Sequence, residues 1–402
     1  MKTAVNMSRN PVSTRTTTPK TTEPITTTET LNAVTERFRS ASFLAVDTEF
    51  MREKTYYPQL CLIQISDGDE AVCIDPLAQG LELGKLWELM RNEDIVKVFH
   101  AAHQDLEIFM NLMGDLPRPV YDTQIAAMVM GQGDQVGYDK LVKAVLDHDI
   151  DKTSRFTDWS KRPLSDRQIV YALDDVIFLA QLYPIIIDRL DKQGRVAWLA
   201  DEFDRLASPD TYRTTPEDAW KRIKIRHMKP PAMLRLMHLA AWREREAQTR
   251  NLPRNRIVRD ETLIDLAGSN PETRSAFSKI RNFPGGTDGK LIDPVLKVLA
   301  KTATESLDDV PVRDNGKRPK RPPIAIMELL RVLLKHVTDD HGIAPRLIAS
   351  ADDLEALALD DNAPIRALDG WRRDIFGTPA LKLKNGKTAI AIENKKIKLI
   401  DL

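Results

Sequence analysis

The sequence predicts an α/β domain, in which helices flank a mixed sheet, followed by two all-helical domains. Three strand-like segments come first, and the turn DGDE between the last two predicts a hairpin. A further strand then alternates with helical patterns, which is typical of a sheet covered by helices. After residue 209 the pattern is almost entirely helical.

The first domain is expected to span residues 24–208. A capping box at Ser165 and Gln168 predicts the start of its longest helix. The domain is expected to end where the Pro-containing segment SPDTYRTTPEDAW begins. Its other expected elements are strands at 43–50, 60–66, 71–75 and 95–99, and helices at 81–91 and 104–113.

Residues 209–293 and 294–402 are predicted to form two related helical domains. The segment LIDLA recurs 91 residues later as LEALA, within the same order of helix and Pro-containing loop. A basic, Pro-rich linker is expected at 316–323. Near the C-terminus, Asn385-Gly386 predicts the turn of a β-hairpin.

The composition favours a protein of the cytoplasm. Residues 1–23 are rich in Thr, Ser and Pro and lack the apolar core of a secretory signal, so we expect a disordered tail. No apolar run approaches the ~20 residues of a membrane span. The only two cysteines, Cys61 and Cys73, lie in strand-like segments, which predicts buried free thiols in a reducing compartment.

The formal net charge is zero, but its distribution is uneven. Between residues 221 and 259 there are twelve Lys or Arg and two acids. This excess predicts contact with nucleic-acid phosphates through sequence-independent electrostatics, and the alternative is a solvated helix face. The candidate nucleic-acid contacts are Lys221, Lys224, Arg226, Arg254, Arg256 and Arg259.

A pair of carboxylates lies in the first strand-like segment, FLAVDTEF. Asp47 and Glu49 are two residues apart, so both point to one face of the strand, ~7 Å apart. Like charges in an apolar setting raise each other's pKa unless a positive charge lies between them. Mg²⁺ or Mn²⁺ suits such oxygen ligands. The alternative is a strand end with two solvated acids.

Two more candidate acids lie at later elements. Asp105 follows an apolar strand and opens a helix, a junction at which α/β proteins collect ligands; the alternative is an ordinary helix N-terminal acid. Tyr171 and Asp175 are one turn apart on one face of the long helix, with Phe178 on the same stripe. Asp174 does not lie on this apolar stripe and is interpreted as a structural residue.

Together these side chains have the composition that two-metal phosphodiester hydrolysis requires. The carboxylates would hold two divalent cations, and the tyrosine hydroxyl would orient the attacking water. The predicted catalytic residues are Asp47, Glu49, Asp105, Tyr171 and Asp175, and the predicted metal ligands are Asp47, Glu49, Asp105 and Asp175.

The motifs DTEF with TYYPQLCLIQ, FHAAHQDLEIF, and TDWSKRPLSDRQIVYALDDV resemble the three exonuclease motifs of the ribonuclease D family, the tyrosine branch of the DEDD exonucleases. The resemblance implies a ribonuclease-H-like sheet. It also implies that Asp47 bridges both metals, that Glu49 and Asp175 complete one site, that Asp105 holds the other and that Tyr171 positions the water.

Downstream, PEDAWKRIK, AAWREREAQTRNLPRNRIVRDETLIDLA and IRNFP resemble the helicase-and-ribonuclease-D C-terminal (HRDC) domain, a helical module that binds nucleic acid. A second, weaker copy spans about residues 295–380. It has Leu333 at the position that corresponds to Trp242, and its long helix is less basic.

The resemblance implies a cytoplasmic, monomeric 3′→5′ exoribonuclease with no membrane partner. It would release nucleoside 5′-monophosphates from RNA with a free 3′ end, with tRNA precursors and other small structured RNAs as substrates. Two alternatives stay open: a DNA exonuclease of the same branch, and an RNA-binding scaffold without catalysis.

Overall fold

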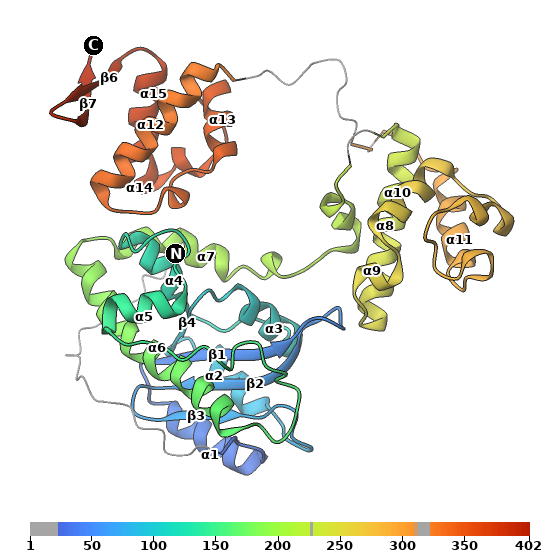
Figure 1. The fold of residues 1–402 in the computed structure, drawn as a ribbon, viewed down its shortest axis with the longest axis horizontal. Helices are drawn as coiled ribbons and strands as arrows, with labels where there is room; N and C mark the ends of the chain where they lie inside the picture. Colours follow the sequence, from blue (N-terminus) through green and yellow to red (C-terminus); the bar gives the residue numbers. More distant parts are fainter. Residues whose placement is uncertain (1–22, 226–227, 309, 312–321) are drawn as a thin grey trace.

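The computed structural model describes residues 23–225, 228–308, 310–311 and 322–402 (Figure 1). The predicted tail lies outside these residues except for Glu23, and most of the predicted linker at 316–323 also lies outside them.

A five-stranded mixed sheet forms the centre of the first domain, in the order β3-β2-β1-β4-β5. Strand β2 is antiparallel to its two neighbours, β1 and β3, and β4 and β5 run parallel to β1. The mixed sheet and the hairpin are therefore confirmed, whereas β5 has no counterpart among the expected strands. The strands are β1 Phe43–Met51, β2 Gln59–Ser66, β3 Ala71–Ile74, β4 Val96–Phe99 and β5 Val120–Asp122.

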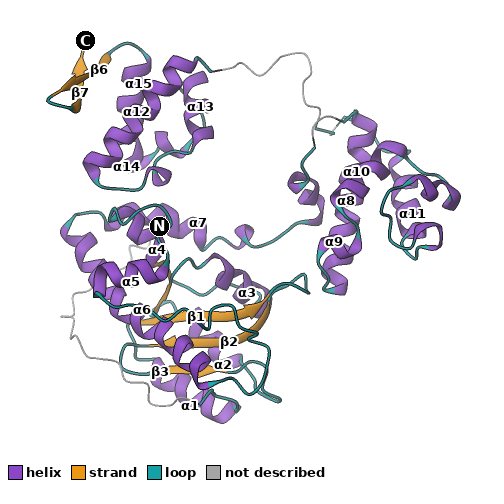
Figure 2. Cartoon of the chain, viewed as in Figure 1, coloured by secondary structure: helices purple, strands orange, loops and turns teal. Residues whose placement is uncertain are grey.

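Helices cover both faces of this sheet (Figure 2). Side chains alternate along β1, so Leu44 and Val46 join the core with α1, α2 and α3, while Ala45 joins the core with α4, α5 and α6. The same alternation directs Asp47 and Glu49 to the face that α6 covers. The helices are α1 Thr28–Phe38, α2 Gly84–Arg91, α3 His103–Met113, α4 Thr123–Val129, α5 Tyr138–Leu146, α6 Asp166–Lys192 and α7 Ala200–Leu206.

Helix α6 is long and apolar enough to cross a membrane by length and composition. Two aspartates, Asp174 and Asp175, interrupt its apolar sequence. The helix packs across β1, β2 and β3, and 61% of its most apolar window is buried inside the protein. Its apolar character is accounted for by this core position.

Two helical modules follow the sheet domain. The first helical module contains α8 Pro230–Arg250, α9 Arg254–Ile257, α10 Asp260–Ser269 and α11 Ile292–Thr302. The second contains α12 Ile324–His341, α13 Ala351–Leu359, α14 Gly370–Arg372 and α15 Thr378–Lys384, and ends in the strands β6 Thr388–Glu393 and β7 Lys396–Asp401.

The elements of the two modules keep the 91-residue offset of the sequence. Helices α8 and α12 end at left-handed residues one offset apart, Asn251 (φ 49°) and Gly342 (φ 58°). Helices α10 and α13 begin at Asp260 and Ala351, again one offset apart. Asn and Gly tolerate this backbone conformation and are common where helices end. The two modules therefore share the order and spacing of these elements.

The C-terminal hairpin exists, but its turn was predicted at the wrong residues. Strands β6 and β7 pair through Glu393 and Lys396, so the two loop residues are Asn394 (φ 52°) and Lys395 (φ 63°). Positive φ at both central residues is what a two-residue type I′ turn requires. Asn385 instead caps α15, and Gly386 follows it with a φ of 69°.

The second helical module docks against the exit of α6. The indole rings of Trp198 and Trp371 stack with centroids 4.3 Å apart. Arg372, only 1% exposed, donates to buried Glu202 and to the main-chain oxygen of Leu347. The Ala344 N–H donates to the Met128 carbonyl (3.1 Å).

We expect Arg372→Leu to lower the free energy of unfolding by about 3 kcal/mol, because it removes a buried partner of Glu202. Urea denaturation followed by tryptophan fluorescence should also detect loss of the Trp198–Trp371 stack. The control is Arg373→Leu, since Arg373 is exposed. Equal stability of the two variants would contradict the role assigned to the buried pair.

Candidate active site

Three of the predicted carboxylates meet between β1 and α6. One oxygen each from Asp47, Glu49 and Asp175 lies within 4.8 Å of the others. Asp175 is buried, and the other two are partly exposed. Strand alternation brings Asp47 and Glu49 to this face, and the packing of α6 across β1 supplies Asp175. The arrangement could hold a metal ion.

The start of α6 and contacts with two tyrosines fix the position of Asp175. The capping box at Ser165 and Gln168 is present, so the helix begins where the sequence predicts. A hydrogen bond with Tyr171, one turn earlier, lowers the pKa of Asp175, although burial raises it more. From α5, the Tyr138 hydroxyl donates to the main-chain oxygen of Asp175.

Asp105 lies beside this trio, in the first turn of α3. It is buried, and the Thr48 hydroxyl donates to its Oδ1 (2.5 Å). Burial and the charge of Asp47 raise its pKa. Thr48 lies between Asp47 and Glu49 in β1, and its hydroxyl therefore orients Asp105.

Asp122 holds the turn that leads into α3. Its carboxylate accepts the N–H groups of Ala101 (3.1 Å) and Ala102 (2.9 Å), and also those of Gln124 and Ile125 at the start of α4. Ala101 adopts a φ of 59°, which costs free energy for a residue with a Cβ. The Asp122 hydrogen bonds offset that cost and place Asp105.

Without a cation the carboxylates are held in an unfavourable state. Burial, then the charges of Asp47, Asp175 and Asp105, raises the pKa of Glu49 to about 10. Burial raises the pKa of Asp175 to about 7, and the pKa of Asp47 lies well above its usual value because of burial and Asp175. Because nearby positive charge favours the ionised forms, this oxygen donor set fits divalent cations.

Arg155 is a positive group at this cluster for which the sequence carries no local signal. Its charge lowers the pKa of Glu49 and of Asp175, and also that of Tyr171. The neighbouring Phe156 is 90% exposed, with the Arg155 guanidinium 5.3 Å from its ring centroid. The segment between α5 and α6 therefore brings a cation and an exposed aromatic ring near the carboxylates.

Gln64 also has no signal in the sequence. It pairs with Asp47 across β1 and β2, and both atoms of its buried amide lack a partner among the described residues. Paired residues project to the same face of a sheet, so this amide lies on the side of the carboxylates.

The six candidate nucleic-acid contacts differ in their exposure and in their ion pairs. Arg226 lies outside the described residues. Lys221 pairs with exposed Asp218 (2.7 Å), and Arg254 holds buried Glu244 (2.6 Å). The other three residues are exposed: Lys224, Arg256 and Arg259.

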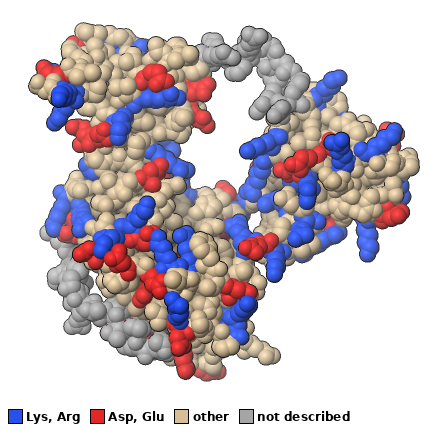
Figure 3. Space-filling model, in the orientation of Figure 1, with Lys and Arg blue, Asp and Glu red and all other residues tan. Residues whose placement is uncertain are grey.

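Acids that flank the basic stretch in sequence neutralise part of it. Glu217 pairs with Arg245, and Asp260 pairs with Arg243 (2.6 Å). The expected excess of positive charge is therefore reduced locally. Lys and Arg nevertheless predominate over acids on the visible face of the first helical module (Figure 3).

Comparisons with known proteins agree with this geometry. The family described as 3′-5′ exonuclease matches residues 22–191, and the HRDC domain family matches residues 234–298. The ribonuclease D of Gluconacetobacter diazotrophicus is 45% identical over 94% of this chain and 96% of its own length. The chain belongs to the ribonuclease D family. Ribonuclease D of Zymomonas mobilis is 46% identical over 93% of this chain and 96% of its own length.

Among solved structures, Escherichia coli RNase D is similar with a TM-score of 0.78 and 29% identity, covering 90% of this chain and 98% of that one. The chain is thus a hydrolytic 3′→5′ exoribonuclease with an HRDC domain, and it acts on RNA. The DEDD exonucleases generally depend on divalent metal, in agreement with the acidic cluster.

We expect Asp122→Ala to lower the free energy of unfolding by about 2–4 kcal/mol, since it leaves several N–H groups without an acceptor. It should also slow RNA hydrolysis on the order of 10²-fold, because Asp105 loses its fixed position. Denaturation and single-turnover rates test both effects. The exposed Asp134→Ala is the control, and an Asp122→Ala rate equal to the control would show that Asp122 does not position Asp105.

Proposed function

We propose that this protein matures the 3′ ends of tRNA precursors and other small structured RNAs. It releases nucleoside 5′-monophosphates one at a time from a free 3′ end. The observation that carries the proposal is the meeting of Asp47, Glu49 and Asp175 within 4.8 Å, with Asp105 beside them. Escherichia coli RNase D, the similar structure, is described as an exoribonuclease involved in structured RNA processing.

The four carboxylates fit two divalent cations, Mg²⁺ or Mn²⁺. In this proposal Asp47 would contact both ions, Glu49 and Asp175 would complete one site, and Asp105 would hold the other. When bound, the cations would stabilise charge on the attacking and leaving oxygens. The raised pKa values of these carboxyl groups support the assignment, because the charge of Arg155 does not offset burial and the repulsion among the acids.

Tyr171 is proposed to orient the attacking water. Burial raises the pKa of its phenol, so the hydroxyl keeps its proton at neutral pH. A protonated hydroxyl beside Asp175 can donate to that carboxylate or hold a water oxygen.

We assign residues 24–208 to the exonuclease domain, 209–293 to the first HRDC domain and 294–402 to a second, HRDC-like domain with the C-terminal hairpin. The repeated helix boundaries at the 91-residue offset support the second domain. The exposed Lys224, Arg256 and Arg259 are proposed RNA contacts of the first.

The protein is proposed to act as a monomer in the cytoplasm. Its two cysteines are buried free thiols, as the sequence predicts, which suits a reducing compartment.

Incubation of 5′-labelled RNA with the enzyme and Mg²⁺ should yield a ladder that shortens by single nucleotides, with nucleoside 5′-monophosphates as products. EDTA should stop the reaction, and Mg²⁺ or Mn²⁺ should restore it. An RNA blocked by a 3′-phosphate and a DNA of the same sequence are the controls. Internal cuts, or equally fast degradation of the DNA, would contradict the proposal.

Asp175→Asn should slow hydrolysis on the order of 10³-fold, because it removes a charge that the reaction requires, while RNA affinity is retained. Asp174→Asn is a matched control, since Asp174 is the adjacent acid on the same helix and lies outside the carboxylate trio. Single-turnover rates and filter binding measure the two effects. Equal rates for the two variants would show that the metal-ligand assignment is wrong.

A further inference from the structure

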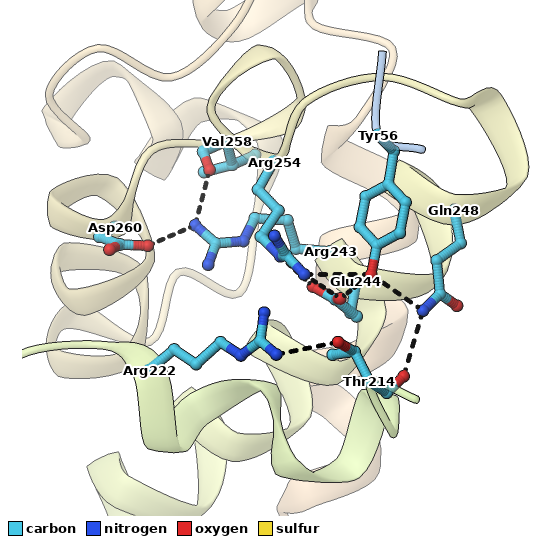
Figure 4. Close-up of polar contacts among 9 residues, drawn as sticks. All are labelled: Tyr56, Thr214, Arg222, Arg243, Glu244, Gln248, Arg254, Val258 and Asp260. Atoms are coloured by element: carbon cyan, nitrogen blue, oxygen red, sulfur yellow. Dashed lines mark hydrogen bonds and ion pairs between the residues drawn. The ribbon is translucent and has the colours of Figure 1, made fainter. Parts of the chain in front are cut away.

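A pocket of about 340 Å³ lies where the loop between β1 and β2 meets the first helical module. Four arginines line it against one acid, Asp260. Figure 4 shows Arg222, Arg243 and Arg254 around one space, with Tyr56 reaching into it from the exonuclease domain. The fourth arginine, Arg52, also belongs to the exonuclease domain.

Arg243 is buried and has one hydrogen-bond donor without an acceptor among the described residues. Its side chain is only 3% exposed, and its Nη1 donates to the Val258 carbonyl (2.9 Å) and to Asp260 (2.6 Å). Its Nε is buried and has no partner among the described residues. A buried guanidinium with an unmet donor is unfavourable, so an acceptor from a ligand would stabilise it.

The neighbouring groups are held in place by contacts with one another. Arg254 donates through Nε and Nη2 to Glu244 and lies 4.7 Å over the Tyr56 ring. The Tyr56 hydroxyl donates to Glu244 as well. Asn251 accepts the main-chain N–H of Tyr56 (3.1 Å). These contacts occupy the charge of Glu244 and fix the two domains against each other at the pocket.

The lining therefore keeps unbalanced positive charge. Arg222 has one hydrogen bond, to the Thr214 hydroxyl (2.9 Å), and no ion pair with a carboxylate in the described parts of the chain. Arg52 pairs with Glu107 (2.8 Å), and both side chains stay partly exposed. Planar guanidinium groups match the geometry of phosphate oxygens, and this arrangement suits a phosphate more than a neutral ligand.

We propose that this arginine pocket binds an internal phosphodiester of the RNA strand whose 3′ end lies at the carboxylates, an inference that rests on the proposed function. Two of the three elements that carry the carboxylates, β1 and α3, lead to it. Arg52 follows Glu49 by three residues at the end of β1, ~10 Å along an extended chain, and its partner Glu107 follows Asp105 by two residues on α3.

A pocket that contacts only phosphate would add affinity without a base preference. An RNA long enough to reach it would gain binding energy, and a dinucleotide at the carboxylates would not. The pocket thereby gives the first helical module a part in selecting longer strands for hydrolysis.

The test compares the wild type with the double variant Arg52→Gln/Arg222→Gln on single-stranded RNAs of increasing length, from a dinucleotide upwards. We expect the ratio of kcat/KM on the longest RNA to that on the dinucleotide to fall about tenfold, as for loss of a charged hydrogen bond. The slope of log kcat/KM against log salt on long RNA should become shallower by about 0.7 for each lost phosphate contact.

Arg274→Gln is the matched control, because Arg274 is an arginine of the same module that pairs with Asp293 and does not line the pocket. It should keep the wild-type length ratio. Thermal unfolding of each variant shows whether the fold is retained.

An unchanged length ratio and salt slope in the double variant would overturn the pocket assignment. So would an equal loss on the dinucleotide and the long RNA, which would indicate a purely structural role. A rise in Tm with inorganic phosphate that the double variant loses, with the length ratio unchanged, would assign the pocket to a free phosphate instead. Failure of the wild type to degrade any RNA would overturn the proposed function itself, which is a distinct result.

Discussion

Mutual repulsion among four carboxylates in a poorly solvated space is the constraint on which the architecture of the candidate active site depends. Asp47, Glu49, Asp105 and Asp175 come from β1, α3 and α6, and burial raises the pKa of each. A flexible site would relieve the repulsion by moving the side chains apart. The sheet and the long helix α6 prevent this, because both lie within packed apolar cores. The same rigidity keeps the four carboxylates close together, an arrangement that fits divalent cations.

Holding the acids requires groups from parts of the chain that are distant in sequence. Asp122 at the end of β5 fixes the turn before α3, Thr48 orients Asp105, and Tyr138 on α5 holds the main chain at Asp175. These residues act through ordinary hydrogen bonds. Each contact helps to fix an acid whose position matters to within a fraction of an ångström. The candidate active site is therefore stabilised by the whole exonuclease domain and by no single motif.

The two helical modules meet the exonuclease domain through different interactions. The second docks through stacked indoles and buried Arg372. The first meets the β1–β2 loop through Tyr56 and Glu244, beside a pocket with unbalanced arginine charge. A closed apolar and ionic contact mainly supports structure, whereas an open cationic one can receive a ligand. This difference agrees with the stronger basic character of the first module in the sequence.

The sequence by itself determined the mixed sheet, the shared face of Asp47 and Glu49, the start of α6 at Ser165 and the repeated spacing of the helical modules. Periodicity and capping encode these features locally. Only the tertiary structure decided that Arg155 and Gln64 adjoin the acids, because their contacts join segments far apart in the chain. It also decided that Asn385-Gly386 ends a helix while Asn394 and Lys395 form the turn. A local sequence pattern limits the conformations that a segment can adopt. Packing then selects the conformation that buries the most apolar surface while its polar groups stay paired.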